Sequence, residues 1–159
     1  MKRKVIFIAL LILAITNFSF ALGTPDFSGT WVLNPEKSDT GLERPGAGKL
    51  PTQTITLVIK QTGTTLSVER KTSDEAATVI FKLDGTESTN KAPNGKDIKS
   101  TSTWVGSTLV TKSTMVMDEM TEQVTVVRSL SADGKVMTIQ VTRQTPRGEI
   151  KQTLIYNKQ

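Results

Sequence analysis

The sequence has 159 residues, with 20 Lys and Arg against 15 Asp and Glu, and a formal net charge of +5. It contains no His and no Cys, which excludes disulfides, Ser–His or Cys–His nucleophiles, and His- or Cys-based metal sites. No run of Lys and Arg follows residue 4, so we expect no nucleic-acid partner. We also expect no cofactor, no metal and no enzymatic activity.

The N-terminus has the three parts of a secretory signal peptide. Basic residues 2–4 precede an apolar run over Val5–Ile15, and Ser19-Phe20-Ala21 places small residues at the −3 and −1 positions of a cleavage site. The competing interpretation is a transmembrane anchor, but the apolar run is shorter than the ~20 residues that a span requires. The pattern therefore predicts a cleavable leader.

Cleavage after Ala21 divides the chain into a signal peptide, residues 1–21, and a mature part, residues 22–159. A cut after Gly23 is a nearby alternative. The mature length suits one domain and is too short for two of typical size. We expect this domain to be periplasmic or secreted and to have no membrane span.

Short runs rich in Val, Ile, Leu and Thr follow, separated by turn signals such as Asp84-Gly85 and Asp133-Gly134. No helical period interrupts them. An antiparallel meander of this length forms a barrel or a sandwich, and closure removes exposed edges. We predict an all-β fold, a single antiparallel up-and-down β-barrel of about 8–10 strands. The expected strands are Gly29–Asn34, Thr54–Gln61, Thr65–Lys71, Thr78–Leu83, Lys99–Val105, Thr108–Met117, Glu122–Leu130, Val136–Arg143 and Ile150–Asn157.

Two stretches are expected to be loops. Pro35–Pro51 is rich in Gly, Pro and charge, and Thr89–Asp97 is rich in Asn, Lys and Gly. Long loops in compact domains often carry function, although a mobile connection without a role is at least as common an outcome.

Several short segments resemble the calycin superfamily, which contains lipocalins and fatty-acid-binding proteins. Gly29-Thr30-Trp31 has the Gly-x-Trp that opens the first strand in that family. Lys99–Trp104, Asp133–Met137 and the terminal strand with Tyr156 are similar to later strands of the fatty-acid-binding branch. The resemblance implies a lipocalin-like barrel that binds a small hydrophobic or amphiphilic ligand.

The sequence departs from that branch at two places. The family has a helix-turn-helix lid after its first strand, but Pro35–Pro51 has too many Pro and Gly residues to form one. The family also carries an Arg two residues before the terminal Tyr, and the two bind the ligand carboxylate. Here Tyr156 is present, but Leu154 stands at the Arg position.

Arg128 is the main candidate for ligand binding. It shares a strand face with Val124, Val126 and Leu130, which alternation predicts to point into the barrel. A buried charge is costly unless it is paired, and a guanidinium can bind a carboxylate with two parallel hydrogen bonds. We therefore expect an anionic group of the ligand beside Arg128.

Arg143 and Arg70 lie on similar apolar faces but near strand ends, where their charges can reach solvent. We retain both as weaker ligand-binding candidates. One Arg could instead lie over Trp31, which we expect to belong to the core.

Tyr156 and Trp104 complete the expected ligand-binding set. Trp104 shares its face with Ser100 and Ser102, a mixture that suits a cavity wall. The face of Leu109, Thr111 and Ser113 suits a cavity or a solvent-facing side equally well.

The alternative function is a protein-interaction or inhibitor module, with a filled barrel that binds a protein partner through loop 35–51. An enzyme is the least supported class, because the carboxylate pairs Asp74-Glu75 and Asp118-Glu119 both fall in expected turns.

Overall fold

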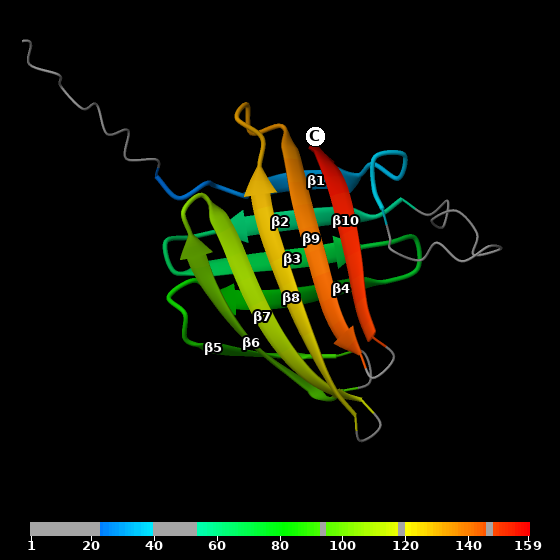
Figure 1. Cartoon of the computed structure of the whole chain (residues 1–159). Coiled ribbons are helices and arrows are strands. Elements are labelled where there is room, and N and C mark those ends of the chain that lie inside the picture. The colour runs from blue at the N-terminus through cyan, green and yellow to red at the C-terminus, as the bar shows by residue number, and fades with distance from the viewer. Residues whose placement is uncertain (1–22, 40–53, 93–94, 118–119, 146–147) are drawn as a thin grey trace, which may run out of the picture.

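The computed structural model describes residues 23–39, 54–92, 95–117, 120–145 and 148–159, in which every regular element is a β-strand (Figure 1). The strands form one antiparallel up-and-down sheet that curls into a nearly closed barrel, as predicted. They are β1 (Gly29–Leu33), β2 (Thr56–Gln61), β3 (Thr65–Lys71), β4 (Ala76–Lys82), β5 (Glu87–Lys91), β6 (Asp97–Val105), β7 (Thr108–Met117), β8 (Met120–Leu130), β9 (Val136–Thr145) and β10 (Gly148–Lys158).

Strands that follow one another in the chain pair with each other, apart from β4 and β5, and two features define the barrel. β1 pairs with both β2 and β10, so the first and last strands close the sheet. β4 and β5 pair only with their other neighbours and leave a seam between them. In Figure 1, β1–β4 run across the view and β7–β10 run steeply in front of them, so the two halves of the sheet face each other.

β5 was not predicted, and the expected loop Thr89–Asp97 is wrong where β5 continues to Lys91. Its sequence, Glu-Ser-Thr-Asn-Lys, has no apolar residue, so hydrophobic alternation gives no signal. The strand forms because it pairs with β6, and its buried side chain is Ser88.

Three expectations fall wholly or partly outside the described residues. The expected signal peptide, residues 1–21, lies within residues 1–22, which are not described, so neither it nor the domain boundary is tested. Of the loop Pro35–Pro51, a turn over residues 35–37 and an isolated bridge from Asp39 to Thr153 are described, whereas residues 40–53 are not. No helix in the described ranges is long and apolar enough to cross a membrane.

Two polar side chains of β5 hold the seam together. Ile80 donates its backbone N–H to Asn90 Oδ1 at 2.8 Å, and Asn90 Nδ2 donates to the Ile80 carbonyl at 2.9 Å. Lys82 N–H donates to Ser88 Oγ at 2.8 Å. These side chains bond to the edge of β4 that faces β5, where β4 has no strand partner.

We expect Asn90→Ala to destabilise the barrel by about 0.5–2 kcal/mol, because both backbone groups of Ile80 lose their partner. The Ile80 amide should also exchange with solvent faster in hydrogen exchange. Thr89→Ala, on the exposed face of the same strand, is the matched control. Equal urea midpoints and unchanged protection of the Ile80 amide in both variants would contradict this role.

The core lies between the two halves of the sheet. Alternation places one side chain in two inside, as in β2, where Leu57 and Ile59 are buried and Lys60 is exposed. The buried hydrophobic cluster consists of Phe27, Trp31, Leu33, Leu57, Ile59, Leu66, Val68, Phe81, Leu83, Leu109, Met137, Ile139, Val141 and Tyr156.

Trp31 is a core residue, as predicted, and its side chain is fully buried. Its indole Nε1 donates to the Phe27 carbonyl at 2.8 Å. The cation over its ring is Lys158, with Nζ 5.2 Å from the centroid, so the expectation of an Arg at this place is wrong. Gly29 permits this arrangement, since a Cβ there would lie 2.8 Å from Lys158 Cε.

Candidate functional site

Arg128 lies inside the barrel, with only 7% of its surface exposed. Its Nη1 donates to Thr111 Oγ1 at 3.1 Å, and its Cζ lies 5.2 Å from the centroid of the Phe81 ring. Its Nε has no hydrogen-bond partner among the described residues. The side chain therefore spans from β8 to both β7 and β4, and one of its donors is unused.

Burial lowers the pKa of Arg128 to about 10, with a smaller opposing effect from Tyr156. The guanidinium is still protonated at neutral pH. None of the ion pairs found between described residues includes it. The interior thus contains a buried cation whose neighbours offer a hydroxyl and a ring face but no counter-charge.

Tyr156 lies near this cation, and Arg70 lies near Tyr156. Tyr156 is buried, and burial raises the pKa of its phenol, while the positive charges of Arg70 and Arg128 act in the opposite direction. Arg70 itself is exposed, as its place near the end of β3 suggested. Three of the five expected ligand-binding residues therefore surround one region, although their contact with a ligand stays a prediction.

Leu154 stands where the fatty-acid-binding branch has the Arg that binds the ligand carboxylate. Leu154 pairs with Ile139 across β10 and β9, and Ile139 pairs with Arg128 across β9 and β8. Leu154 and Arg128 therefore lie in the same row across the inner face. The guanidinium in this row comes from β8 instead of β10.

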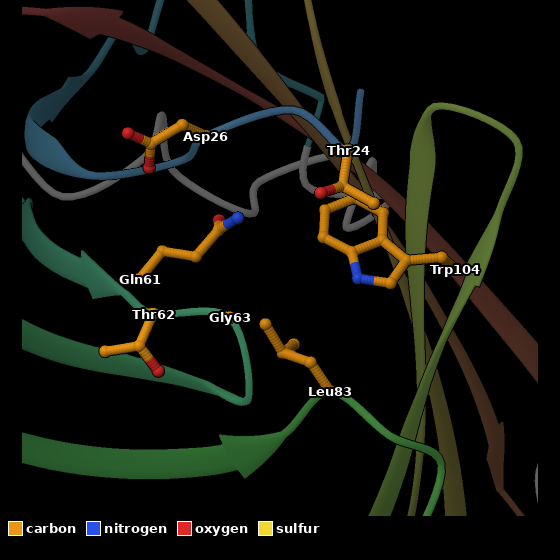
Figure 2. A pocket seen from close by; sticks show the side chains of 7 residues that line it. All are labelled: Thr24, Asp26, Gln61, Thr62, Gly63, Leu83 and Trp104. Atoms are coloured by element: carbon orange, nitrogen blue, oxygen red, sulfur yellow. The ribbon is translucent and has the colours of Figure 1, made fainter. Parts of the chain in front are cut away.

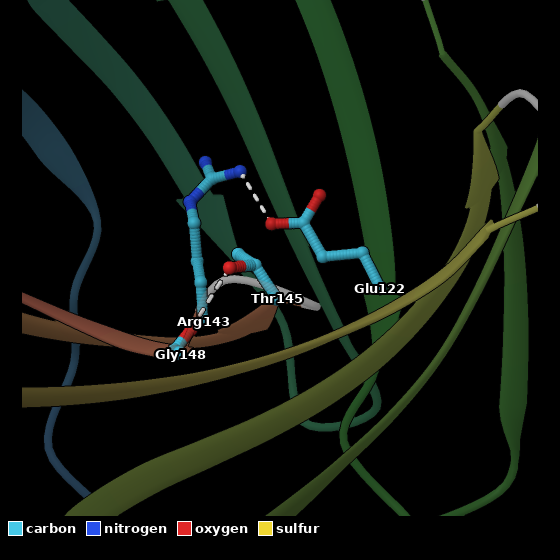
Figure 3. A network of polar contacts seen from close by, with 4 residues as sticks. All are labelled: Glu122, Arg143, Thr145 and Gly148. Carbon is cyan, nitrogen blue, oxygen red and sulfur yellow. Dashed lines mark hydrogen bonds and ion pairs between the residues drawn. The ribbon is translucent and has the colours of Figure 1, made fainter.

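Arg143 has a different partner. Its Nη1 lies 3.2 Å from Glu122 Oε1, an ion pair that Figure 3 shows beside Thr145 and Gly148. Glu122 is at the opposite end of β8 from Arg128, and sequence reasoning did not identify it. The structure thus supplies Arg143 with a carboxylate of its own and does not bring it to Arg128.

Trp104 lines an open pocket (Figure 2). The pocket has a volume of about 270 Å³, and neither Arg128 nor Tyr156 is among its lining residues. The ring of Trp104 stacks on Phe27, with centroids 5.9 Å apart and an interplanar angle of 13°. The other lining residues are Thr24, Asp26, Gln61, Thr62, Gly63 and Leu83. Thr24 and Asp26 of the N-terminal segment complete this pocket, and sequence reasoning missed them because that segment carries no motif.

Gln61 fixes the N-terminal segment against the barrel. Its Nε2 donates to the Pro25 carbonyl at 2.9 Å, and its Oε1 accepts from the Phe27 N–H at 3.0 Å. Both ends of this amide are therefore occupied by backbone groups.

Carboxylates do not assemble into a metal site within the described ranges. Asp74 and Glu75 are exposed in the turn before β4, whereas Asp118 and Glu119 lie outside the described residues.

Neither protein-family profiles nor curated protein sequences gave a match to this chain. Solved structures do match. A fatty acid transporter, REP1-NXSQ, is 18% identical with a TM-score of 0.61, covering 83% of this chain and 95% of its own. Fatty-acid-binding protein 1 of Echinococcus granulosus is 18% identical with a TM-score of 0.60, covering 83% of this chain and 96% of its own.

A Schistosoma mansoni fatty-acid-binding protein, solved in complex with arachidonic acid, is 20% identical with a TM-score of 0.60. The match covers 84% of this chain and 96% of that one. The fold is that of the fatty-acid-binding proteins. The calycin-type barrel expected from Gly29-Thr30-Trp31 is therefore confirmed as a fold, at an identity too low to transfer a ligand.

Proposed function

We propose that this protein is an exported carrier of a small amphiphile with an anionic head and an apolar tail. The observation that carries the proposal is Arg128, a buried guanidinium that finds neither a counter-charge nor a partner for its Nε donor in the part of the chain that the structure describes. A carboxylate or similar anion would neutralise the charge and accept this hydrogen bond.

The surroundings of Arg128 suit an amphiphile better than a small inorganic anion. Phe81, Leu109 and Ile139 lie beside it, so the atoms attached to the anionic head would contact apolar side chains. The phenol of Tyr156 is protonated at neutral pH, and burial raises its pKa further, so Tyr156 would donate a hydrogen bond to the same head. The three matched structures are named as fatty acid transport or binding proteins, which supports the same ligand class.

Native mass spectrometry of the full chain, purified from the cells that make it, tests the proposal. We expect one lipid-sized adduct per protein and a protein mass that lacks residues 1–21. After delipidation, palmitate should bind about 100-fold more tightly than its uncharged methyl ester, because only the carboxylate pairs with Arg128. Equal affinity for acid and ester, or no binding of either, would overturn the proposal.

A protein-interaction module remains the alternative prediction. Its expected contact, loop 35–51, lies mostly outside the described residues, so no contact in the structure favours it. Tight association with a protein in the same experiment, without an adduct, would favour this alternative.

A further inference from the structure

Polar side chains line one wall of the barrel interior, next to Arg128. Ser88 of β5 lies opposite Ser100 of β6, and Ser100 lies opposite Ser113 of β7. Ser102 and Thr111 form the adjacent pair in the same two strands. Three strands thus present five hydroxyl groups, while the other inner faces contribute most of the hydrophobic cluster.

Most of these hydroxyls have partners within the protein. Ser102 Oγ and Thr111 Oγ1 are 2.9 Å apart, and Thr111 accepts from Arg128. Ser88 accepts from the backbone of Lys82 at the seam. These groups are therefore occupied by fixed contacts.

Ser100 differs from these three residues. It is only 3% exposed, and among the described residues its Oγ has no hydrogen-bond partner. It points inward, since its neighbours Lys99 and Thr101 are exposed. A buried hydroxyl without a partner is costly, so this group is a donor and acceptor aimed at whatever occupies the barrel.

The position of Ser100 relative to Arg128 defines a second point of recognition. Ser102 belongs to the hydrogen-bonded group that ends on the guanidinium, and Ser100 lies two residues further along the same strand, about 7 Å away. An anion bound at Arg128 would therefore place the middle of its chain, not its head, beside Ser100.

We infer that the ligand is an oxygenated amphiphile, with a hydroxyl or carbonyl oxygen on its chain that hydrogen-bonds to Ser100. This inference rests on the proposed carrier function and specifies its ligand class. A plain hydrocarbon chain would leave the Ser100 hydroxyl unpaired, whereas an oxygen at the matching position would satisfy it. The protein should therefore bind amphiphiles with an oxygen on the chain more tightly than amphiphiles with a plain hydrocarbon chain.

The test compares palmitate with a series of hydroxypalmitates in which the hydroxyl moves along the chain, titrated calorimetrically into the delipidated full-length protein. The native protein should bind the best positional isomer roughly three- to tenfold more tightly than palmitate, as expected for one neutral hydrogen bond. Ser100→Ala should remove this preference and leave palmitate affinity unchanged or slightly improved. Thr101→Val, which removes an exposed hydroxyl from the outer face of β6, should keep the preference.

The outcomes separate this inference from the carrier proposal. If palmitate and every isomer bind equally to the native protein, Ser100 is not a recognition point and the inference fails, while the carrier function stands. A preference that survives in Ser100→Ala overturns it in the same way. If no carboxylate binds the native protein, the carrier proposal itself fails.

Discussion

Replacing Arg128 by Met is expected to stabilise the ligand-free barrel while weakening ligand binding. The substitution removes a buried, unpaired cation and puts an apolar side chain of similar length beside Phe81. Replacing buried charges by apolar side chains typically raises the free energy of unfolding by about 1–3 kcal/mol. Affinity for palmitate should fall about 100-fold, because the carboxylate would then be buried without a counter-charge. Urea denaturation and calorimetric titration of the delipidated protein measure the two effects.

Arg143→Met is the matched control. Arg143 is paired with Glu122, whose side chain is 15% exposed, so this substitution leaves a mostly buried carboxylate without this partner. We expect a loss of about 0.5–1.5 kcal/mol and little change in affinity. If Arg128→Met destabilised the protein as Arg143→Met does, Arg128 would be a structural residue, and its proposed role would be wrong.

Trp31→Ala is expected to cause the largest loss of stability, about 3–5 kcal/mol, which is the cost of removing a large buried aromatic side chain. The substitution also removes the hydrogen bond to the Phe27 carbonyl and the ring beneath Lys158. Because β1 joins β2 to β10, we expect the closure of the barrel to weaken together with the core. The free energy of unfolding, from urea titration followed by circular dichroism, is the measurement.

Trp104→Ala provides the comparison for Trp31. Trp104 is half-buried and borders an open pocket, so part of its surface is already in contact with water. Its removal should cost about 1–2 kcal/mol. Equal losses for the two tryptophans would contradict the larger contribution to stability that we expect from Trp31.

Hydrophobic alternation was sufficient to predict the barrel and the inward position of Arg128. Val124, Val126 and Leu130 repeat at every second residue of β8, so the position between the last two must face the same side. The same reasoning failed for β5, where the inward residues Ser88 and Asn90 are polar. Such a strand is defined by its partners in space, which a local pattern does not contain.

The partners of the site residues were harder to predict than the residues themselves. Glu122 follows from strand register, because it precedes by two residues the position opposite Arg143, but the register was not known in advance. Phe81 comes from the far side of the barrel and depends on its curvature. The sequence showed that Leu154 replaces the Arg of the fatty-acid-binding branch. It did not show that Arg128 lies in the same row of paired residues across the inner face.

The pairing of β1 with β10 sets the order in which this chain can complete its fold. The hairpins from β2 onward need only nearby residues, whereas the closing contacts are remote: Ile155 N–H donates to Ser38 Oγ, 117 residues away along the chain. Until β10 is available to pair with it, β1 therefore has one edge unpaired. Such an edge can recruit a strand from a neighbouring molecule. A stalled or truncated chain is consequently the form of this protein most prone to aggregate.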